Sequence, residues 1–105
     1  MLHDVITLGY RLRCARARAG LSLRALAYLV GCNESTLSRY ECGLVSRPNM
    51  VTLIVCAEKC GVRVPWLLGM ESIPATDDAE ANDWLERACS RLADDCVVKY
   101  KRASV

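Results

Sequence analysis

A chain of 105 residues, of which 52% are hydrophobic and 25% charged, is long enough to bury one hydrophobic core but too short for two substantial domains. No apolar run reaches the ~20 residues that span a bilayer, and the first residues lack the basic start and long apolar core of a signal peptide. We therefore expect a cytoplasmic protein without membrane contact, built as one compact domain plus an appendage.

The formal net charge of +2 is unevenly distributed along the chain. Residues 1–70 carry nine basic and four acidic side chains, whereas residues 71–105 carry five basic and eight acidic side chains. Only the first part is therefore suited to bind a polyanion.

The cysteine content is high for a chain of this length, with thiols at Cys14, Cys32, Cys42, Cys56, Cys60, Cys89 and Cys96. An odd number of cysteines on predicted helices argues against a disulfide framework. Cys56 and Cys60 share a helical face and could in principle bind a metal, but the chain has a single histidine, His3, and no Cys-x-x-Cys pair. We favour buried packing for most of them and expect no metal or cofactor. Cys42, beside Gly43 at a helix end, is expected to be exposed.

The first predicted helix runs from about Val5 or Thr7 to Ala19, and Gly20 ends it. Its apolar face is formed by Leu8, Leu12 and Ala15. The opposite face is basic and carries Arg11, Arg13 and Arg18.

Two short helices follow, at about 23–30 and 34–42, separated by a turn at Gly31, where a left-handed backbone costs little. Ser22 and Asn33 precede them and suit N-caps, whose side-chain oxygens accept hydrogen bonds from the first amides. The residues expected to form a shared core between the two helices are Leu26, Val30, Leu37 and Tyr40, with the small Ala27 at the point of close approach.

The remaining pattern predicts a loop over 44–48, a helix over 51–60 stopped by Gly61, and a short helix over 64–68. Residues 71–77, which include Pro74, are predicted to be a linker. A last helix, from about Asp78 to Lys101, is amphipathic. Its apolar stripe consists of Ala81, Trp84, Leu85, Ala88, Cys89, Leu92, Cys96 and Tyr100.

Part of this pattern resembles a known family. The series is Leu21-Ser22, Leu26-Ala27, Gly31, Ser35-Thr36-Leu37-Ser38-Arg39, Glu41 and Gly43, followed by Arg47-Pro48, Gly61-Val62, Val64 and Trp66-Leu67-Leu68-Gly69. It resembles the helix-turn-helix proteins of the lambda-repressor-like family, also called Cro/CI or XRE, over roughly residues 5–70. The resemblance implies an all-α fold: a five-helix DNA-binding domain over 1–70, the linker at 71–77, and a C-terminal amphipathic helix over 78–105. It also implies a prokaryotic or phage-encoded source.

In that family the start of the third helix enters the major groove of DNA. The matching positions, which the resemblance assigns to base reading, are Glu34, Ser35, Thr36, Ser38 and Arg39. Arg39 has the clearest chemistry, because its planar fork can donate two hydrogen bonds to guanine, worth roughly 1–3 kcal/mol of discrimination. Glu34 has two readings, as an acceptor for cytosine N4 or as a residue favoured at a helix N-terminus.

Contacts to the DNA backbone are expected from helix starts and flanking arginines. The candidates are Ser22, Arg24, Asn33 and Arg47, with weaker claims for Arg11 and Arg13. Leu23 stands where relatives commonly have a glutamine that contacts phosphate, so either that contact is lost or Arg24 replaces it. Cys42 stands where relatives are commonly polar. Arg16 and Glu41 match a pair that forms a structural ion pair in relatives.

The resemblance implies a sequence-specific transcriptional regulator, expected to be a repressor that binds a palindromic operator as a homodimer. The two recognition helices would then lie about 34 Å apart. The candidate dimer contact is the C-terminal stripe of Trp84, Leu85, Ala88, Leu92 and Cys96, although that helix could instead pack on its own domain. The alternative function is an antitoxin that binds a toxin through its C-terminal segment and represses its own operon.

An enzyme is disfavoured by the sequence. The chain has one histidine and contains no phosphate-binding loop or nucleophile elbow. Ser35 and Ser38 lack an evident base partner.

Overall fold

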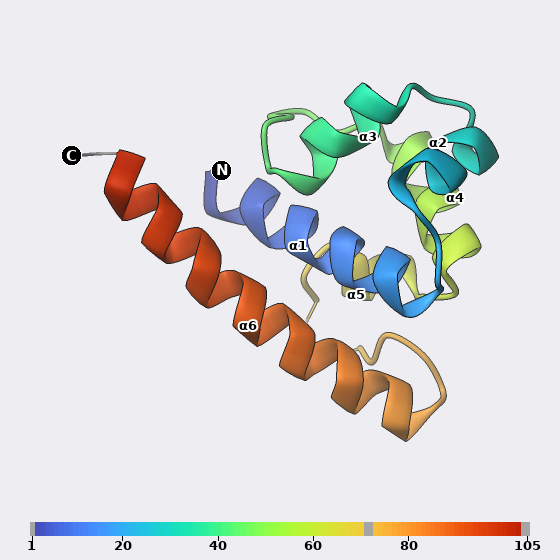
Figure 1. Ribbon diagram of the computed structural model, residues 1–105. Helices are drawn as coiled ribbons and strands as arrows, with labels where there is room; N and C mark the ends of the chain where they lie inside the picture. The colour runs from blue at the N-terminus through green and yellow to red at the C-terminus, as the bar shows by residue number, and fades with distance from the viewer. Residues whose placement is uncertain (1, 71–72, 104–105) are drawn as a thin grey trace.

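The computed structural model describes residues 2–70 and 73–103, and side chains for residues 7–70 and 73–92. Within those ranges the chain forms six helices and no strand, so the predicted all-α fold is confirmed (Figure 1). The helices are α1 (Leu2–Arg18), α2 (Leu23–Val30), α3 (Glu34–Glu41), α4 (Met50–Cys60), α5 (Val64–Leu67) and α6 (Ala79–Ala103). None of them is long and apolar enough to cross a membrane.

The first five helices enclose one hydrophobic core. Leu12 of α1, Leu26 of α2 and Leu37 of α3 are completely buried at its centre. The core also contains Leu8, Ala15, Ala27, Tyr40, Leu53, Cys56, Ala57, Cys60 and Leu67. These positions recur every three or four residues, so the helical periodicity of the sequence predicted most of the buried faces.

Helix ends follow the expected cap chemistry with one exception. The Ser22 hydroxyl accepts a hydrogen bond from the Ala25 amide at 3.0 Å, and Gly31 ends α2 in the left-handed conformation at φ 85°. Asn33 occupies the N-cap position of α3, but its side chain accepts no capping hydrogen bond, so that part of the prediction was wrong. Asn33 is exposed, and water can serve the first amides of the helix instead.

A second, smaller core joins α6 to α1. It is formed by Cys14 of α1, Ala75, and Leu85 and Cys89 of α6, with Trp66 packed against it. Figure 1 shows α6 running alongside α1, on the side away from α3. The α6 stripe therefore covers an apolar face that residues 1–70 leave open on α1.

For Leu85, Ala88 and Leu92 this packing corrects the expected dimer contact in favour of the alternative, that the last helix packs on its own domain. Leu85 is only 1% exposed, and Ala88 and Leu92 pack against the same intrachain cluster. Trp84 remains 43% exposed, and Cys96 lies outside the described side chains. A face already buried within one chain cannot meet a second copy without unpacking.

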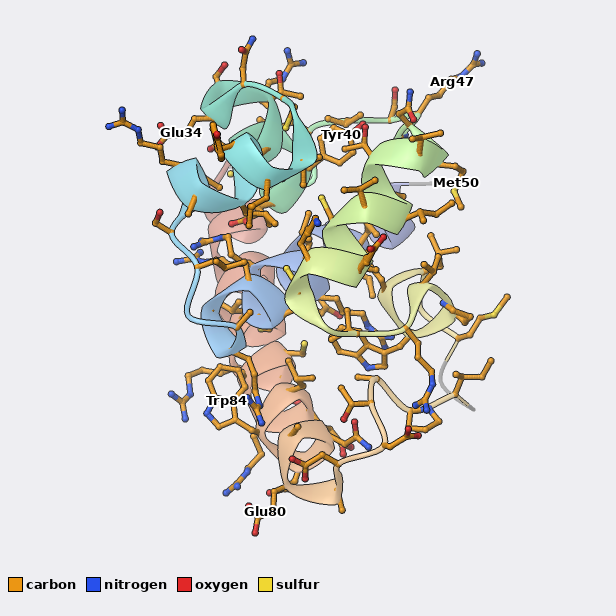
Figure 2. The ribbon with its side chains drawn as sticks, turned by 90° about the vertical axis from the view of Figure 1, so that its right-hand side faces the viewer. Glu34, Tyr40, Arg47, Met50, Glu80 and Trp84 are labelled. Carbon is orange, nitrogen blue, oxygen red and sulfur yellow. The ribbon has the colours of Figure 1, made fainter. Side chains whose placement is uncertain are left out.

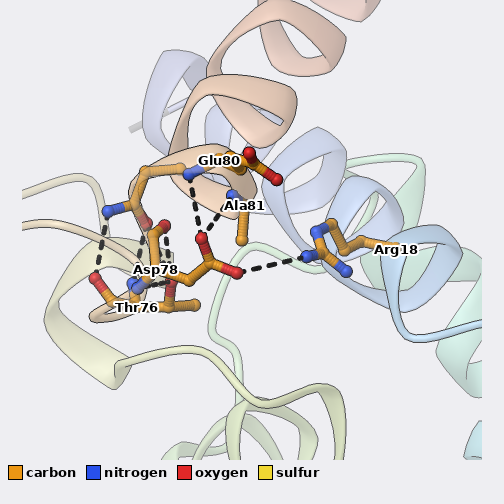
Figure 3. A network of polar contacts seen from close by, with 6 residues as sticks. Arg18, Thr76, Asp78, Glu80 and Ala81 are labelled. Atoms are coloured by element: carbon orange, nitrogen blue, oxygen red, sulfur yellow. Dashed lines mark hydrogen bonds and ion pairs between the residues drawn. The ribbon is translucent and has the colours of Figure 1, made fainter.

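The segment before α6 is held in place rather than being a free connection (Figure 3). The Asn82 side chain hydrogen-bonds to both backbone groups of Thr76. It accepts from the Thr76 amide at 2.9 Å and donates to the Thr76 carbonyl at 3.0 Å. Asp78 caps α6 by accepting from the Glu80 amide at 2.9 Å, and its other oxygen lies 4.0 Å from Arg18 of α1. The start of α6 is therefore fixed to the rest of the fold.

Candidate nucleic-acid interface

Helix α3 presents one face to the core and the other to solvent. Leu37 is completely buried and Tyr40 is 7% exposed, so these two residues set the rotation of the helix about its axis. The predicted base-reading residues Glu34, Ser35 and Arg39 are exposed, and Thr36 and Ser38 are half-buried. All five side chains are thus absent from the core and belong to the outer surface or its border.

Helix α1 passes directly against the C-terminal end of α3, and Gly9 makes this approach possible. A Cβ atom at Gly9 would lie 2.5 Å from the Glu41 carbonyl oxygen and 2.9 Å from that of Tyr40. Such contacts are sterically forbidden, so only glycine fits. The position of the recognition helix therefore depends on a backbone contact that no side chain mediates.

Arg16 and Glu41 form the ion pair predicted from the sequence. The Arg16 Nε and Nη2 atoms donate to the two carboxylate oxygens of Glu41 at 2.6 and 3.0 Å, and Nη1 donates to the Leu21 carbonyl at 2.9 Å. The hydrogen bonds to Glu41 raise the pKa of Arg16 above its ordinary value. One guanidinium thus joins α1, the loop before α2 and the end of α3.

The hydroxyl of Tyr40 ties α3 to the beginning of α4. It accepts a hydrogen bond from the Asn49 amide at 2.9 Å. Asn49 in turn caps α4, because its side-chain oxygen accepts from the amides of Val51 at 2.9 Å and Thr52 at 3.3 Å. This chain of contacts fixes both ends of the loop that carries Arg47.

A surface hollow of about 370 Å³ lies between α3 and this loop. Its walls include Thr36 and Arg39 from α3 and Arg47 from the loop. Leu44, Val45 and Ser46 complete the loop side. Arg39, predicted to read bases, and Arg47, predicted to hold phosphate, therefore line the same hollow.

The remaining predicted backbone contacts divide into two groups. Arg24, in the first turn of α2, is exposed beside Ser22 at a second, shallower hollow. Arg13 is also exposed. The structure corrects the assignment of Arg11 to the DNA backbone. Its guanidinium donates to the Trp66 carbonyl and lies 5.1 Å from the centroid of the Trp66 ring. Arg11 is thus engaged in intrachain packing and cation–π contact.

Figure 2 shows that the two ends of the molecule differ. Glu34 and Arg47 lie at one end, whereas Glu80 and Trp84, at the start of α6, lie at the other. The basic candidates Arg39 and Arg47 share the first end through their common hollow. The acidic C-terminal part of the chain therefore begins far from the candidate interface.

Sequence reasoning missed three positioning features. The hydroxyl contact of Tyr40 joins residues nine positions apart across an irregular loop, and no sequence pattern signals it. The role of Gly9 has a weak signal, because glycine inside a helical pattern costs stability and suggests a close approach. The cap at Asn49 had a clear signal, since asparagine directly precedes an apolar helix.

Cys56 and Cys60, the candidate metal ligands, are buried in the main core. In the part of the chain that the structure describes, no three histidine, cysteine, aspartate or glutamate side chains come together. Burial raises the pKa of Cys56 to about 12 and that of Cys60 to about 11, which keeps both thiols protonated in the core. Cys42 is exposed, as predicted.

Comparison with known proteins agrees with this geometry. Residues 7–65 match the family model described as a helix-turn-helix domain. The restriction-modification controller protein C.AhdI from Aeromonas hydrophila is similar in structure at a TM-score of 0.58 and 29% identity, over 62% of this chain and 97% of that one. SinR, solved in a SinR/SinI complex, shares the fold at a TM-score of 0.57 and 24% identity, over 93% of this chain and 99% of that one.

No curated protein matches this sequence. The family match nevertheless covers more than half of the chain. The matched residues include α2, the turn at Gly31 and α3. The chain therefore belongs to the helix-turn-helix family and is a DNA-binding regulator of the lambda-repressor-like, or XRE, type.

Proposed function

We propose that the protein is a transcriptional repressor that recognises a specific palindromic operator as a homodimer. The observation that carries this proposal is the shared hollow, which is lined by Arg39 of α3 and Arg47 of the following loop. A duplex lying across that surface would meet a base-reading fork and a phosphate ligand together. The similarity to C.AhdI, described as a controller protein, supports a regulatory role.

Within this proposal the exposed face of α3 reads the bases. Arg39 donates to a guanine in the major groove, and the neighbouring exposed side chains Glu34 and Ser35 contact the adjacent bases. Thr36 and Ser38 are half-buried and lie at the border of that face. Arg24 and Arg47 hold phosphates on either side, which sets the register of the helix in the groove without carrying sequence information.

The homodimer requires a surface other than the buried α6 stripe. Exposed apolar side chains occur on α4 and just after α5: Met50, Val51, Ile54, Leu68 and Met70. Between 43% and 69% of each of these side chains is exposed, and exposed apolar side chains that lie together can mark an interaction surface. We assign this face to the second copy of the chain.

The rival function, an antitoxin, needs a C-terminal segment that is free to bind its toxin. The packing of Leu85 and Cys89 against α1 disfavours that reading, because these residues of the α6 stripe, together with Ala88 and Leu92, already pack within the chain. An antitoxin would have to release α6 before binding. We therefore favour the repressor.

Selection of bound sequences from random duplex DNA tests the proposal directly. We expect an enriched palindrome whose half-sites are about 10 base pairs apart, centre to centre, because the recognition helices of a two-fold dimer are spaced by one turn of DNA. Enrichment of a single unrepeated half-site would refute the homodimer, and binding without any enrichment would refute sequence-specific recognition. The matched comparison is the Arg39→Ala, Arg47→Ala double variant, which should bind all sequences more weakly and lose the base preference that Arg39 supplies.

A further inference from the structure

We propose that Cys14 and Cys89 form an oxidation site, at which the two thiols are converted into an intrachain disulfide that links α1 to α6. The inference concerns the small core between these helices and does not depend on the DNA-binding proposal. It rests on the contact between the two side chains, on their position in the fold and on an adjoining cavity.

The two thiols meet across the helix interface. Cys14 belongs to α1 and Cys89 to α6, and both lie in the small core that holds the two helices together. The thiols hydrogen-bond to one another. Cysteines far apart in the sequence but in direct side-chain contact are the arrangement from which a disulfide forms with little backbone movement.

The hydrogen bond between the two thiols shifts their pKa values in opposite directions. The hydrogen bond from Cys89, helped by the nearby Arg13, lowers the pKa of the Cys14 thiol below its ordinary value. The same hydrogen bond, with burial, raises the pKa of Cys89. The two thiols therefore titrate as a pair, and the thiolate that the pair yields is the nucleophilic form of cysteine.

A route from solvent exists on the Cys89 side. Cys14 is 2% exposed and Cys89 is 9% exposed, but Cys89 also lines a cavity of about 530 Å³ between α1, α5 and α6. Tyr10, Arg11 and Trp66 form other parts of its wall. A small oxidant such as hydrogen peroxide can reach Cys89, the hydrogen-bond partner of Cys14, through this cavity without unfolding of the chain.

The reaction is a two-electron oxidation with hydrogen peroxide as the oxidant. The thiolate of one of the two cysteines attacks one peroxide oxygen, which breaks the O–O bond, forms a sulfenic acid and releases hydroxide that takes up a proton to become water. The sulfur of the other cysteine then attacks the sulfenic sulfur, and its proton leaves with the hydroxyl group as a second water. Two thiols and one peroxide thus yield one disulfide and two waters.

The described chain contains a matched pair that should not react. Cys56 and Cys60 are buried in the main core on one helix, and burial raises their pKa to about 12 and about 11. Neither borders the cavity beside Cys89. They differ from the proposed site in acidity and in access, while sharing its burial.

The experiment uses the reduced full chain, treated with hydrogen peroxide in native buffer, blocked with a maleimide and digested with trypsin. We expect the short peptides 14–16 and 88–91 to be recovered joined, with the mass of two hydrogen atoms lost, and to separate on reduction. Cys56 and Cys60 should be recovered as free thiols once the digest exposes them. The oxidised chain should melt roughly 10 °C higher than the reduced chain, because a cross-link restricts the unfolded state.

The control variants separate the site from general oxidation. Cys89→Ala should abolish the cross-link, whereas Cys42→Ala, which removes an exposed thiol, should leave its yield unchanged. Recovery of Cys14 and Cys89 as free thiols while Cys42 is consumed would overturn the proposal. A cross-link that lowered the melting temperature would overturn it too, since the bond would then form only in a distorted chain.

Discussion

The hydroxyl of Tyr40 accepts a hydrogen bond from the backbone amide of Asn49 at 2.9 Å, so the recognition helix is joined to the first turn of α4. Arg47 lies in the loop that this bond closes. The phosphate-contacting candidate and the base-reading helix are therefore held in one rigid unit. Tyr40 makes this connection with a ring that is buried in the core and a hydroxyl that accepts the hydrogen bond from the loop.

Tyr40→Phe should weaken this unit without disturbing the core. Removal of the hydroxyl deprives the partly buried Asn49 amide of its partner, at a cost of about 0.5–1.5 kcal/mol in the free energy of unfolding. DNA affinity should fall for all sequences, while the preferred operator stays the same. Urea unfolding and a binding titration check these effects, with Tyr28→Phe as the control because Tyr28 is 85% exposed. An altered operator preference would contradict the positioning role.

Arg39→Ala and Arg47→Ala should have different effects on DNA binding. The first should relax base preference at one operator position, at about 1–3 kcal/mol of discrimination. The second should weaken all sequences equally and reduce the slope of log affinity against log salt by about one unit. Site selection and salt titrations distinguish the two. Arg11→Ala is the control, since Arg11 contacts Trp66 and should alter stability rather than the salt slope.

Gly9→Ala should destabilise the protein although alanine is the better helix former. Replacing glycine by alanine within a helix normally gains up to about 1 kcal/mol. Here the new Cβ would meet the Glu41 carbonyl oxygen at 2.5 Å, and relieving the clash should cost about 1–3 kcal/mol. Thermal or urea unfolding gives the sign. A gain in stability would mean that α1 and α3 are not in direct backbone contact.

Stability should fall with pH above about pH 9 because of the buried thiol of Cys56. Its pKa is raised from 9.0 to about 12 in the folded protein. The unfolded chain therefore releases this proton before the folded chain does. The stabilisation is complete below pH 9 and declines by up to about 1.4 kcal/mol per pH unit as the pH rises towards 12.

Cys56→Ala should flatten this alkaline decline, which urea unfolding between pH 8 and pH 11 would measure. The difference between wild type and variant removes the contribution of other groups that titrate in the same range. Cys42→Ala, at an exposed site, provides the matched control. Parallel curves for wild type and Cys56→Ala would show that Cys56 is ionised or accessible in the folded state.

Ile54→Asp and Leu85→Ala should separate assembly from stability. Ile54 is 45% exposed on α4, so the charge should convert the proposed dimer into monomers and change the stability of the fold by no more than about 0.5 kcal/mol. Leu85 is 1% exposed in the core between α1 and α6, so its truncation should cost about 2–5 kcal/mol and leave the mass in solution unchanged. Mass measurements and unfolding curves check both. A monomeric Leu85→Ala of normal stability would return the dimer contact to α6.

The sequence by itself determined the helices, several of their ends and the family. Apolar residues at helical spacing placed the core faces of α1 to α5, and Ser22, Gly31 and Gly61 marked helix ends, because these signals act within a few residues. The match of residues 7–65 to the helix-turn-helix model follows from the same local pattern. The pairing of Arg16 with Glu41 was reached through the resemblance alone.

The tertiary structure determined which groups the surface residues contact and what covers the apolar face of α6. The sequence left open whether the α6 stripe would meet its own domain or another chain, and the fold places it on α1. It offered Arg11 as a DNA contact, but the fold puts Trp66 beneath that guanidinium. Contacts between residues distant along the chain depend on how helices cross, and helical periodicity specifies which face is apolar but not what that face will meet.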